Sequence, residues 1–179
     1  MTDLDRLFRE FNEPLVRYLT RRLADRDWAE EVAQETFLRA ARHGPLTSER
    51  SWLFAVATNL IRDEARKDLR RRRHLELLAQ EARAAEPVTP QLDAIDRAEA
   101  AAAARKALDA LPERDREALL MREEGLDYTE IAKALDLSVA SVGTTLARAR
   151  RRLVEAYEEQ TGERRPAPGE RSRGTHAAY

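Results

Sequence analysis

Apolar side chains recur at three- and four-residue spacing through the first part of the chain, which is the periodicity of an amphipathic helix. The first run has apolar side chains at Leu4, Leu7, Phe8, Phe11, Leu15, Tyr18, Leu19 and Leu23. Pro14 lies inside this run, so we expect a kink or break just before it. A second helix is predicted to start near Asp27, because Asp27 and Glu30 have capping-box spacing. A third helix is predicted over residues 48–73.

The second part of the chain returns to a helical pattern after a segment of prolines and small residues, 84–92, which indicates a linker. Four further helices are predicted there, over residues 92–110, 111–125, 128–135 and 139–158. The last twenty residues are polar and contain Pro and Gly, so we expect a disordered tail. No strand pattern of any length occurs.

The predicted fold class is therefore all-α, with two small helical domains joined by a flexible linker and a helix-turn-helix in the C-terminal one. The predicted domain bounds are residues 1–75, an acidic linker at 76–104, residues 105–158, and a tail at 159–179.

Charge is sorted along the 179 residues although the net charge is only −1. Residues 62–73 and 138–153 each carry a net charge of +4, whereas residues 76–100 carry −4. Two separate basic blocks favour two separate contacts with an anionic partner such as nucleic acid. Of the 32 basic residues, 29 are Arg, and Arg grips phosphates and stacks on bases better than Lys. A GC-rich genome would also explain this preference.

Composition narrows the classes of protein further. The absence of cysteine excludes disulfides and Cys-based metal centres and fits a reducing, cytoplasmic location. No apolar run is long enough for a membrane span, and the acidic N-terminus does not resemble a signal peptide. The three histidines (His43, His74 and His176) have no metal-ligand spacing, and no phosphate loop or nucleophile motif is present. We therefore expect neither an enzyme nor a cofactor or metal site.

Residues 128–153 have the pattern of a helix-turn-helix, with a short helix, a tight turn and a longer helix. Asp127 and Ser138 are placed to cap the two helices, and Asp136 suits a left-handed turn position. A recognition helix presents its first residues to base edges in the major groove. The candidates for base contact are Ser138, Ala140, Ser141, Thr144 and Thr145. The candidates for phosphate contact are Arg148, Arg150, Arg151 and Arg152. An ordinary helical hairpin with a solvated Arg face is the plainer alternative.

The helix-turn-helix alone indicates a general DNA-binding protein, and the N-terminal half of the chain indicates a more specific class. AEEVAQETFLRA (29–40) followed by SWLFAVATNLIRDEARKDLRRRR (51–73) resembles region 2 of bacterial sigma factors. The segment from Leu111 to Leu153 resembles their region 4. This pairing, with an acidic linker between the halves, resembles the extracytoplasmic function (group 4) branch of the sigma-70 family over roughly residues 3–157.

The resemblance implies a promoter-specificity subunit that binds the RNA polymerase core and promoter DNA. Its region 2 would dock on the β′ clamp helices and its region 4 on the β flap, and an anti-sigma factor is an implied further partner. The implied polymerase-docking residues are Glu30, Glu31, Gln34 and Glu35. A solvated acidic face is the alternative for each of them.

The resemblance also implies that the third helix opens and reads the −10 element. Its candidate contacts are Trp52, Asn59, Arg62, Asp63, Arg66 and Lys67. Amides and aromatics beside a basic track suit single-stranded DNA. Trp52 falls on the apolar stripe, so a place in the core is favoured over base stacking. The loop at residues 43–51 corresponds to the family's pocket for a flipped base.

One stretch departs from the family pattern. The family usually carries Lys or Arg in the middle of the region 4 recognition helix, where this chain has Val142, Gly143, Thr144 and Thr145. Gly143 in a helix costs about 1 kcal/mol relative to Ala. Close approach of the backbone to DNA is a possible benefit. A stand-alone helix-turn-helix regulator is the alternative function, and it would need a sensing or dimerising N-terminal domain.

Overall fold

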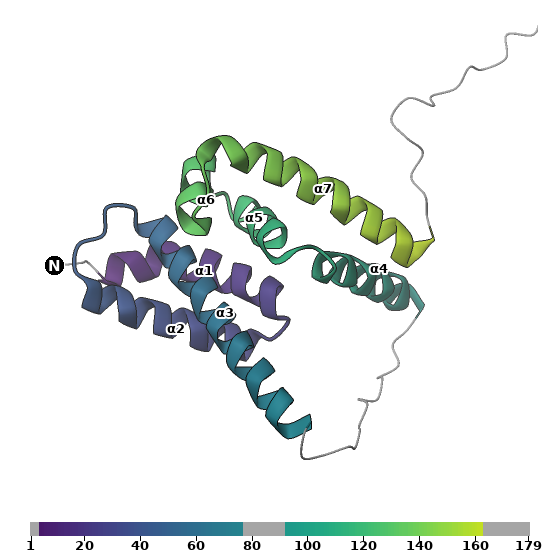
Figure 1. The fold of residues 1–179 in the computed structure, drawn as a ribbon, viewed down its shortest axis with the longest axis horizontal. Helices are drawn as coiled ribbons and strands as arrows, with labels where there is room; N and C mark the ends of the chain where they lie inside the picture. The colour runs from purple at the N-terminus through teal and green to yellow at the C-terminus, as the bar shows by residue number, and fades with distance from the viewer. Residues whose placement is uncertain (1–3, 77–91, 163–179) are drawn as a thin grey trace, which may run out of the picture.

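The computed structural model describes residues 4–76 and 92–162, which form seven helices and no strand (Figure 1). The N lobe consists of α1 (Leu4–Leu23), α2 (Arg26–His43) and α3 (Glu49–Glu76). The C lobe consists of α4 (Leu92–Asp109), α5 (Glu113–Glu123), α6 (Tyr128–Leu135) and α7 (Val139–Thr161). The predicted all-α fold with two helical parts is confirmed. No helix in the described ranges is long and apolar enough to cross a membrane.

The N lobe is built on the apolar faces that the sequence periodicity predicts. Leu7, Leu15 and Leu19 of α1 are fully buried together with Leu53 and Phe54 of α3. The Tyr18 hydroxyl lies 2.8 Å from the Thr58 hydroxyl, which satisfies both polar groups inside the core. Burial also raises the pKa of Tyr18 well above its ordinary value, so its phenol stays neutral.

Two local features of the N lobe refine the predictions. Of the kink or break predicted at Pro14, the break is absent, because α1 runs without interruption from Leu4 to Leu23. The second helix starts near Asp27 as predicted, at Arg26, but Asp27 is not its cap. Asp25 is its N-cap, and its carboxylate accepts a hydrogen bond of 3.0 Å from the Trp28 amide. Asp25 and Asp27 are both good capping residues. The backbone is extended at Asp25, as an N-cap requires, so Asp25 is the cap.

The C lobe contains the predicted helix-turn-helix in α6 and α7. The capping box of Asp127 and Glu130 is present, with two reciprocal hydrogen bonds of 2.8 Å. Asp136 ends α6 in the left-handed conformation, at φ 53° and ψ 56°. The Ser138 side chain accepts a hydrogen bond from the Ser141 amide and caps α7. These three local predictions are confirmed, and together they fix the turn between the helices.

The helix α4 packs along α7, so part of the predicted linker at 76–104 is helical. The remaining part, residues 77–91, lies outside the described residues. The predicted tail at 159–179 begins inside α7, which ends at Thr161 before Gly162 at φ 69°. Residues 163–179 also lie outside the described part.

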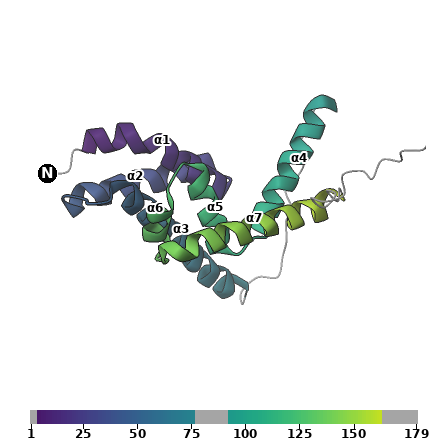
Figure 2. The ribbon, with the colours of Figure 1, turned by 90° about the horizontal axis from the view of Figure 1, so that it is seen from above.

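The two lobes pack against each other through α1, α3, α5 and α6. In both views α5 lies between the N lobe and α7 (Figures 1 and 2). The far end of α3 extends away from the rest of the molecule in the same two views. Because α5 contacts α1, α6 and α7, its position relates the helix-turn-helix to the N lobe.

Candidate nucleic-acid interface

The start of α7 presents a small polar surface to solvent. Ser138, Ala140 and Thr144 are exposed, and Ser141 is half-buried. The Ser138 and Ser141 hydroxyls are partly used by the cap, since Ser141 Oγ lies 2.8 Å from the Ser138 carbonyl oxygen. Thr144 therefore offers a hydroxyl and a methyl group at the centre of this surface. Both groups suit contacts with base edges, the methyl group with thymine.

Thr145 does not belong to this surface. It is only 4% exposed and shares the inner face of α7 with Val142, Leu146 and Ala149. The prediction that Thr145 contacts a base is therefore wrong. Residues three and four apart on a helix share one face, so Thr145 follows Val142 into the core rather than Thr144 into solvent.

Arg148 also has a different role from the one predicted. Its guanidinium donates two hydrogen bonds to Asp115 of α5, at 3.0 and 2.6 Å. Arg152 donates a third, at 2.6 Å, to the same carboxylate, which is 2% exposed. Arg148 and Arg152 thus join α7 to α5, and their hydrogen bonds go to a carboxylate instead of the predicted phosphate. The hydrogen bond from Arg148, supported by Arg152, holds the pKa of Asp115 below its ordinary value despite burial.

Arg150 and Arg151 remain on the outer face of α7. Both are exposed, and Arg151 has only a long i,i+4 contact of 3.7 Å with Glu155. An exposed pair of this kind is weak and leaves the guanidinium accessible to another anion. Their position beyond the small polar surface is where phosphate contacts would fix a recognition helix in the groove.

The glycine in the recognition helix has no packing reason within the described part of the chain. A Cβ added to Gly143 would lie 3.6 Å from Tyr128 Cε2, which is an ordinary van der Waals distance. Its backbone is helical, in contrast to Gly125 at φ +84°. The fold therefore accepts a larger residue at position 143.

On α3, Asn59 and Asp63 are exposed and lie four residues apart, so they share one face of the helix. Arg62 is half-buried, and its guanidinium is bound to Glu117 of α5. Arg66 and Lys67 belong to α3, and the structure describes their backbone but not their side chains.

The loop before α3 surrounds a hollow of about 350 Å³. It is lined by His43, Pro45, Leu46, Thr47, Ser48, Ser51, Trp52, Ala55 and Lys133. Trp52 is partly buried against the core, and its ring packs edge-on against His43 at 5.0 Å between centroids. Trp52 therefore serves the core and also borders this hollow. Lys133 comes from α6, and its ammonium donates a 2.8 Å hydrogen bond to the Ser48 hydroxyl.

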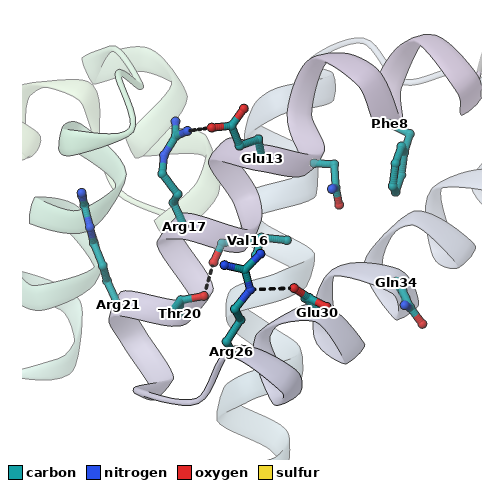
Figure 3. A pocket seen from close by; sticks show the side chains of 10 residues that line it. Phe8, Glu13, Val16, Arg17, Thr20, Arg21, Arg26, Glu30 and Gln34 are labelled. Atoms are coloured by element: carbon teal, nitrogen blue, oxygen red, sulfur yellow. Dashed lines mark hydrogen bonds and ion pairs between the residues drawn. The ribbon is translucent and has the colours of Figure 1, made fainter.

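The predicted polymerase-docking residues lie on the outer surface of α2. Glu30 and Gln34 line a groove of about 700 Å³ between α1 and α2 (Figure 3). Glu31 is exposed, whereas Glu35 is partly covered and pairs with Arg39 at 2.8 Å. Glu30 likewise pairs with Arg26 at 2.9 Å. These i,i+4 pairs stabilise an isolated helix by only about 0.2–0.5 kcal/mol each, so a partner's cations can replace them.

The same groove contains residues that the sequence patterns did not single out. Arg17 and Arg21 of α1 line its far side, and Phe8 lines its open end (Figure 3). Phe8 is 46% exposed, although its ring also contacts Phe37 at 5.2 Å between centroids. Phe8 lies on the apolar periodicity of α1, so the pattern identified its apolar face but not its partial exposure.

Two family models match this chain. "Sigma-70 region 2" matches residues 7–73, and "Sigma-70, region 4" matches residues 101–153. These ranges cover most of α1–α3 and the whole of α5 and α6. The two models together therefore include both surfaces described above.

Curated relatives and a solved structure agree with this assignment. The chain is 32% identical over 139 residues to the ferric citrate uptake sigma factor FecI of Escherichia coli, covering 75% of this chain and 79% of that protein. It is 30% identical over 169 residues to the ECF RNA polymerase sigma factor SigE of Mycolicibacterium smegmatis, covering 91% of this chain and 65% of that protein. The sigma factor RpoE of Bartonella quintana, solved with the anti-sigma factor NepR, has the same fold. It superposes with a TM-score of 0.63 at 23% identity, covering 88% of this chain and 98% of RpoE.

The chain therefore belongs to the sigma-70 family of bacterial sigma factors, in its extracytoplasmic function branch.

Replacement of Gly143 by Ala should stabilise the fold by about 1 kcal/mol, because the helical backbone gains rigidity and the added methyl group has room. Urea unfolding followed by circular dichroism measures this. The same substitution at Gly125 is the matched control and should destabilise the chain, since its φ of +84° disfavours a side chain. A loss of stability for Gly143→Ala would contradict the description of this site.

Replacement of Asp115 by Asn should lower the free energy of unfolding by about 2 kcal/mol. Removing one partner of a fully buried ion pair typically costs about 3–5 kcal/mol. The expected cost is smaller here because the guanidinium groups of Arg148 and Arg152 are half-exposed. Glu123→Gln removes the same charge from an exposed site on α5 and should have little effect. Equal unfolding free energies for the two variants would contradict the role of Asp115.

The Asp115 contribution should also depend on pH. The lowered pKa means that the folded chain binds a proton at Asp115 less readily than the unfolded chain. The stabilisation is therefore present above the ordinary aspartate pKa and is lost as the pH falls through the lowered one. The difference between the wild type and Asp115→Asn should shrink over that acidic range.

Proposed function

We propose that this sigma factor binds the RNA polymerase core and directs transcription initiation by recognising a −35 element as duplex and a −10 element as melted single strand. The observation that carries the proposal is the presence, in one chain, of two different candidate DNA-contacting surfaces. One is the outer face of α7. The other is formed by the exposed Asn59 amide on the basic helix α3 and by the hollow near Trp52 at the start of that helix. A stand-alone regulator would need only the first.

The recognition helix fits duplex DNA. Its exposed first turns carry Ser138, Ala140, Ser141 and Thr144, which are small enough to enter the major groove closely. Arg150 and Arg151 supply positive charge for phosphates further along. Because these side chains are small, we expect their base contacts to contribute modestly to the affinity for DNA. The phosphate contacts that position the helix would contribute more.

The N lobe fits melted DNA. Asn59 offers an exposed amide on α3, and the hollow near Trp52 is of a size to accept an unstacked base. Extruding a base costs a few kcal/mol, so a preformed hollow would offset part of that cost. Arg62, Asp63, Arg66 and Lys67 complete the proposed −10 set on the same helix.

The outer face of α2, with Glu30, Glu31, Gln34 and Glu35, is the proposed docking site for the polymerase β′ clamp helices, and the C lobe is that for the β flap. This face borders the α1/α2 groove at Glu30 and Gln34. An acidic and amide-bearing face next to the exposed Phe8 suits a basic helix that also offers apolar side chains. Reversible binding of an anti-sigma factor to the same chain is part of this proposal. RpoE of Bartonella quintana is an example of such a complex.

In vitro transcription with purified bacterial core polymerase on fragmented genomic DNA tests the proposed function directly. Mapping of RNA 5′ ends should reveal new discrete starts that share two upstream elements when this protein is added. No new starts, with tight binding to duplex DNA in the absence of polymerase, would instead support the stand-alone regulator.

Replacement of both Arg150 and Arg151 by Ala should weaken binding to duplex DNA at every sequence. The slope of log affinity against log salt should become shallower by about 2, because two phosphate contacts are lost. Fluorescence anisotropy with duplexes of different sequence measures both effects. The Arg9→Ala/Arg114→Ala variant removes equal charge from exposed positions on α1 and α5 and serves as the control. A loss confined to certain promoters would show that these arginines read bases.

Replacement of Asn59 by Ala should reduce open-complex formation by about tenfold, because a lost hydrogen bond to a base costs on the order of 1 kcal/mol. Permanganate reactivity of unpaired thymines measures opening, and co-elution measures binding to core polymerase. Core binding should be unchanged for Asn59→Ala. Glu31→Arg should give the converse result, with weak core binding. If Asn59→Ala weakened core binding, its assignment to the −10 contact would be wrong.

A further inference from the structure

Tyr128, the first residue of α6, holds its ring in a fixed position at the surface of the helix-turn-helix. The residue is 42% exposed. The Arg122 guanidinium lies over the ring, 5.7 Å from its centroid, and donates a 2.8 Å hydrogen bond to the carbonyl oxygen of Leu126. Arg122 is therefore a positioning residue for the ring. A side chain that is already held in place loses little conformational freedom when a ligand covers it, which favours binding.

Gly143 of α7 leaves the edge of this ring uncovered. A Cβ at position 143 would lie 3.6 Å from Tyr128 Cε2, so any side chain there would begin at the ring edge and cover it. The backbone at Gly143 is helical and does not require glycine, and glycine lowers the stability of a helix relative to alanine. The fold therefore gains nothing from Gly143, whereas an open ring edge depends on it.

The surroundings of the ring edge are small and largely apolar. Ala140 precedes Gly143 by three residues and Thr144 by four, so these residues share one face of α7. Ala140 and Thr144 are both exposed on that face. We call the ring edge of Tyr128, the Gly143 backbone and the methyl groups of Ala140 and Thr144 the aromatic surface.

The chemistry of the aromatic surface matches one base. In the major groove the four bases present hydrogen-bond donors and acceptors, and only thymine presents an apolar group, its C5 methyl. Ring carbons and methyl groups cannot satisfy the polar edges of the other bases, but they pack well against another methyl group. The aromatic surface therefore favours thymine by apolar contact.

We propose that Tyr128 is a specificity-determining residue whose ring packs against a thymine methyl group in the upstream promoter element, and that Gly143 keeps the ring uncovered for this contact. The inference rests on the proposed function, because it assigns a base to the helix-turn-helix that reads duplex DNA. It extends the base-contacting set from α7 to α6. It also explains a helical glycine that the fold does not need.

The full chain assembled with core polymerase provides the test. Transcription from a library of promoters with a randomised upstream element first identifies the preferred element. Single thymines of that element are then replaced by uracil, which pairs in the same way but lacks the methyl group. For the wild type, replacement of one particular thymine should lower transcript output about fourfold, the effect expected for burial of one methyl group.

The ratio of output from the thymine and uracil templates is measured with one protein preparation, so the amount of folded protein cancels. Tyr128→Ala removes the ring and Gly143→Gln covers it, so both should bring the ratio at that thymine to about one. Tyr128→Phe should keep the wild-type ratio, because the contact needs the ring and not the hydroxyl. Glu159→Gln places a glutamine at an exposed position near the far end of α7 and is the matched control.

The outcomes separate this inference from the proposed function. If the wild type uses promoters of the library but shows no such thymine, or if Tyr128→Ala keeps the ratio, the contact does not exist and the proposed function stands. If Tyr128→Phe loses the ratio, the hydroxyl and not the ring reads the base, which also overturns the inference. If the wild type starts no transcription from any promoter, the proposed function fails and this inference fails with it.

Discussion

Three buried carboxylates on and beside the short helix α5 join it to three other helices of the described structure. Asp115, Glu117 and Glu124 of the α5 region are each almost inaccessible to water, and each is paired with arginines from a different helix. Asp115 binds α7, Glu117 binds α3, and Glu124 binds α1. A buried carboxylate without a partner is strongly destabilising, so these pairs determine where α7, α3 and α1 can lie relative to α5.

Arginine accordingly has more than one role in this sigma factor. Arg148 and Arg152 hold the recognition helix against α5, while Arg150 and Arg151 on the same helix face solvent. The alternation follows from helix geometry, since positions 148 and 152 share a face that 150 does not. The planar, permanently charged guanidinium suits both roles, because carboxylates and phosphates accept the same paired hydrogen bonds. Arginines whose chemistry suits DNA phosphates can therefore also bind glutamates within the chain.

The local features of the fold were predictable from the sequence, whereas the pairing between distant residues was not. The capping box at Asp127, the left-handed Asp136 and the cap at Ser138 involve residues at most three apart, and the pattern contains that information. The sequence pattern favoured Asp27 as the cap of α2, whereas Asp25 is the cap, because two equivalent capping residues lie in one turn. Thr145 was misplaced because apolar periodicity gives no weight to a buried threonine.

The partners of Arg62 and Arg148 illustrate the same limit at longer range. Glu117 lies 55 residues from Arg62, and Asp115 lies 33 residues from Arg148. Both acids occur in the charged segment ERDRE, which reads as a solvated helix face, and nothing in its spacing distinguishes buried acids from exposed ones. Only tertiary packing shows that α5 is enclosed on several sides. The sequence thus did not predict the residues that hold the candidate site in place, and the site's contacts with DNA stay a prediction.

The most direct test of this account removes the carboxylate that joins α5 to α3. The central claim is that the buried carboxylates of the α5 region determine where α7, α3 and α1 lie relative to α5. Glu117→Gln should therefore lower the free energy of unfolding in urea by about 2 kcal/mol, whereas Glu123→Gln, on the exposed face of the same helix, should have little effect. Equal unfolding free energies for these two variants would contradict the account.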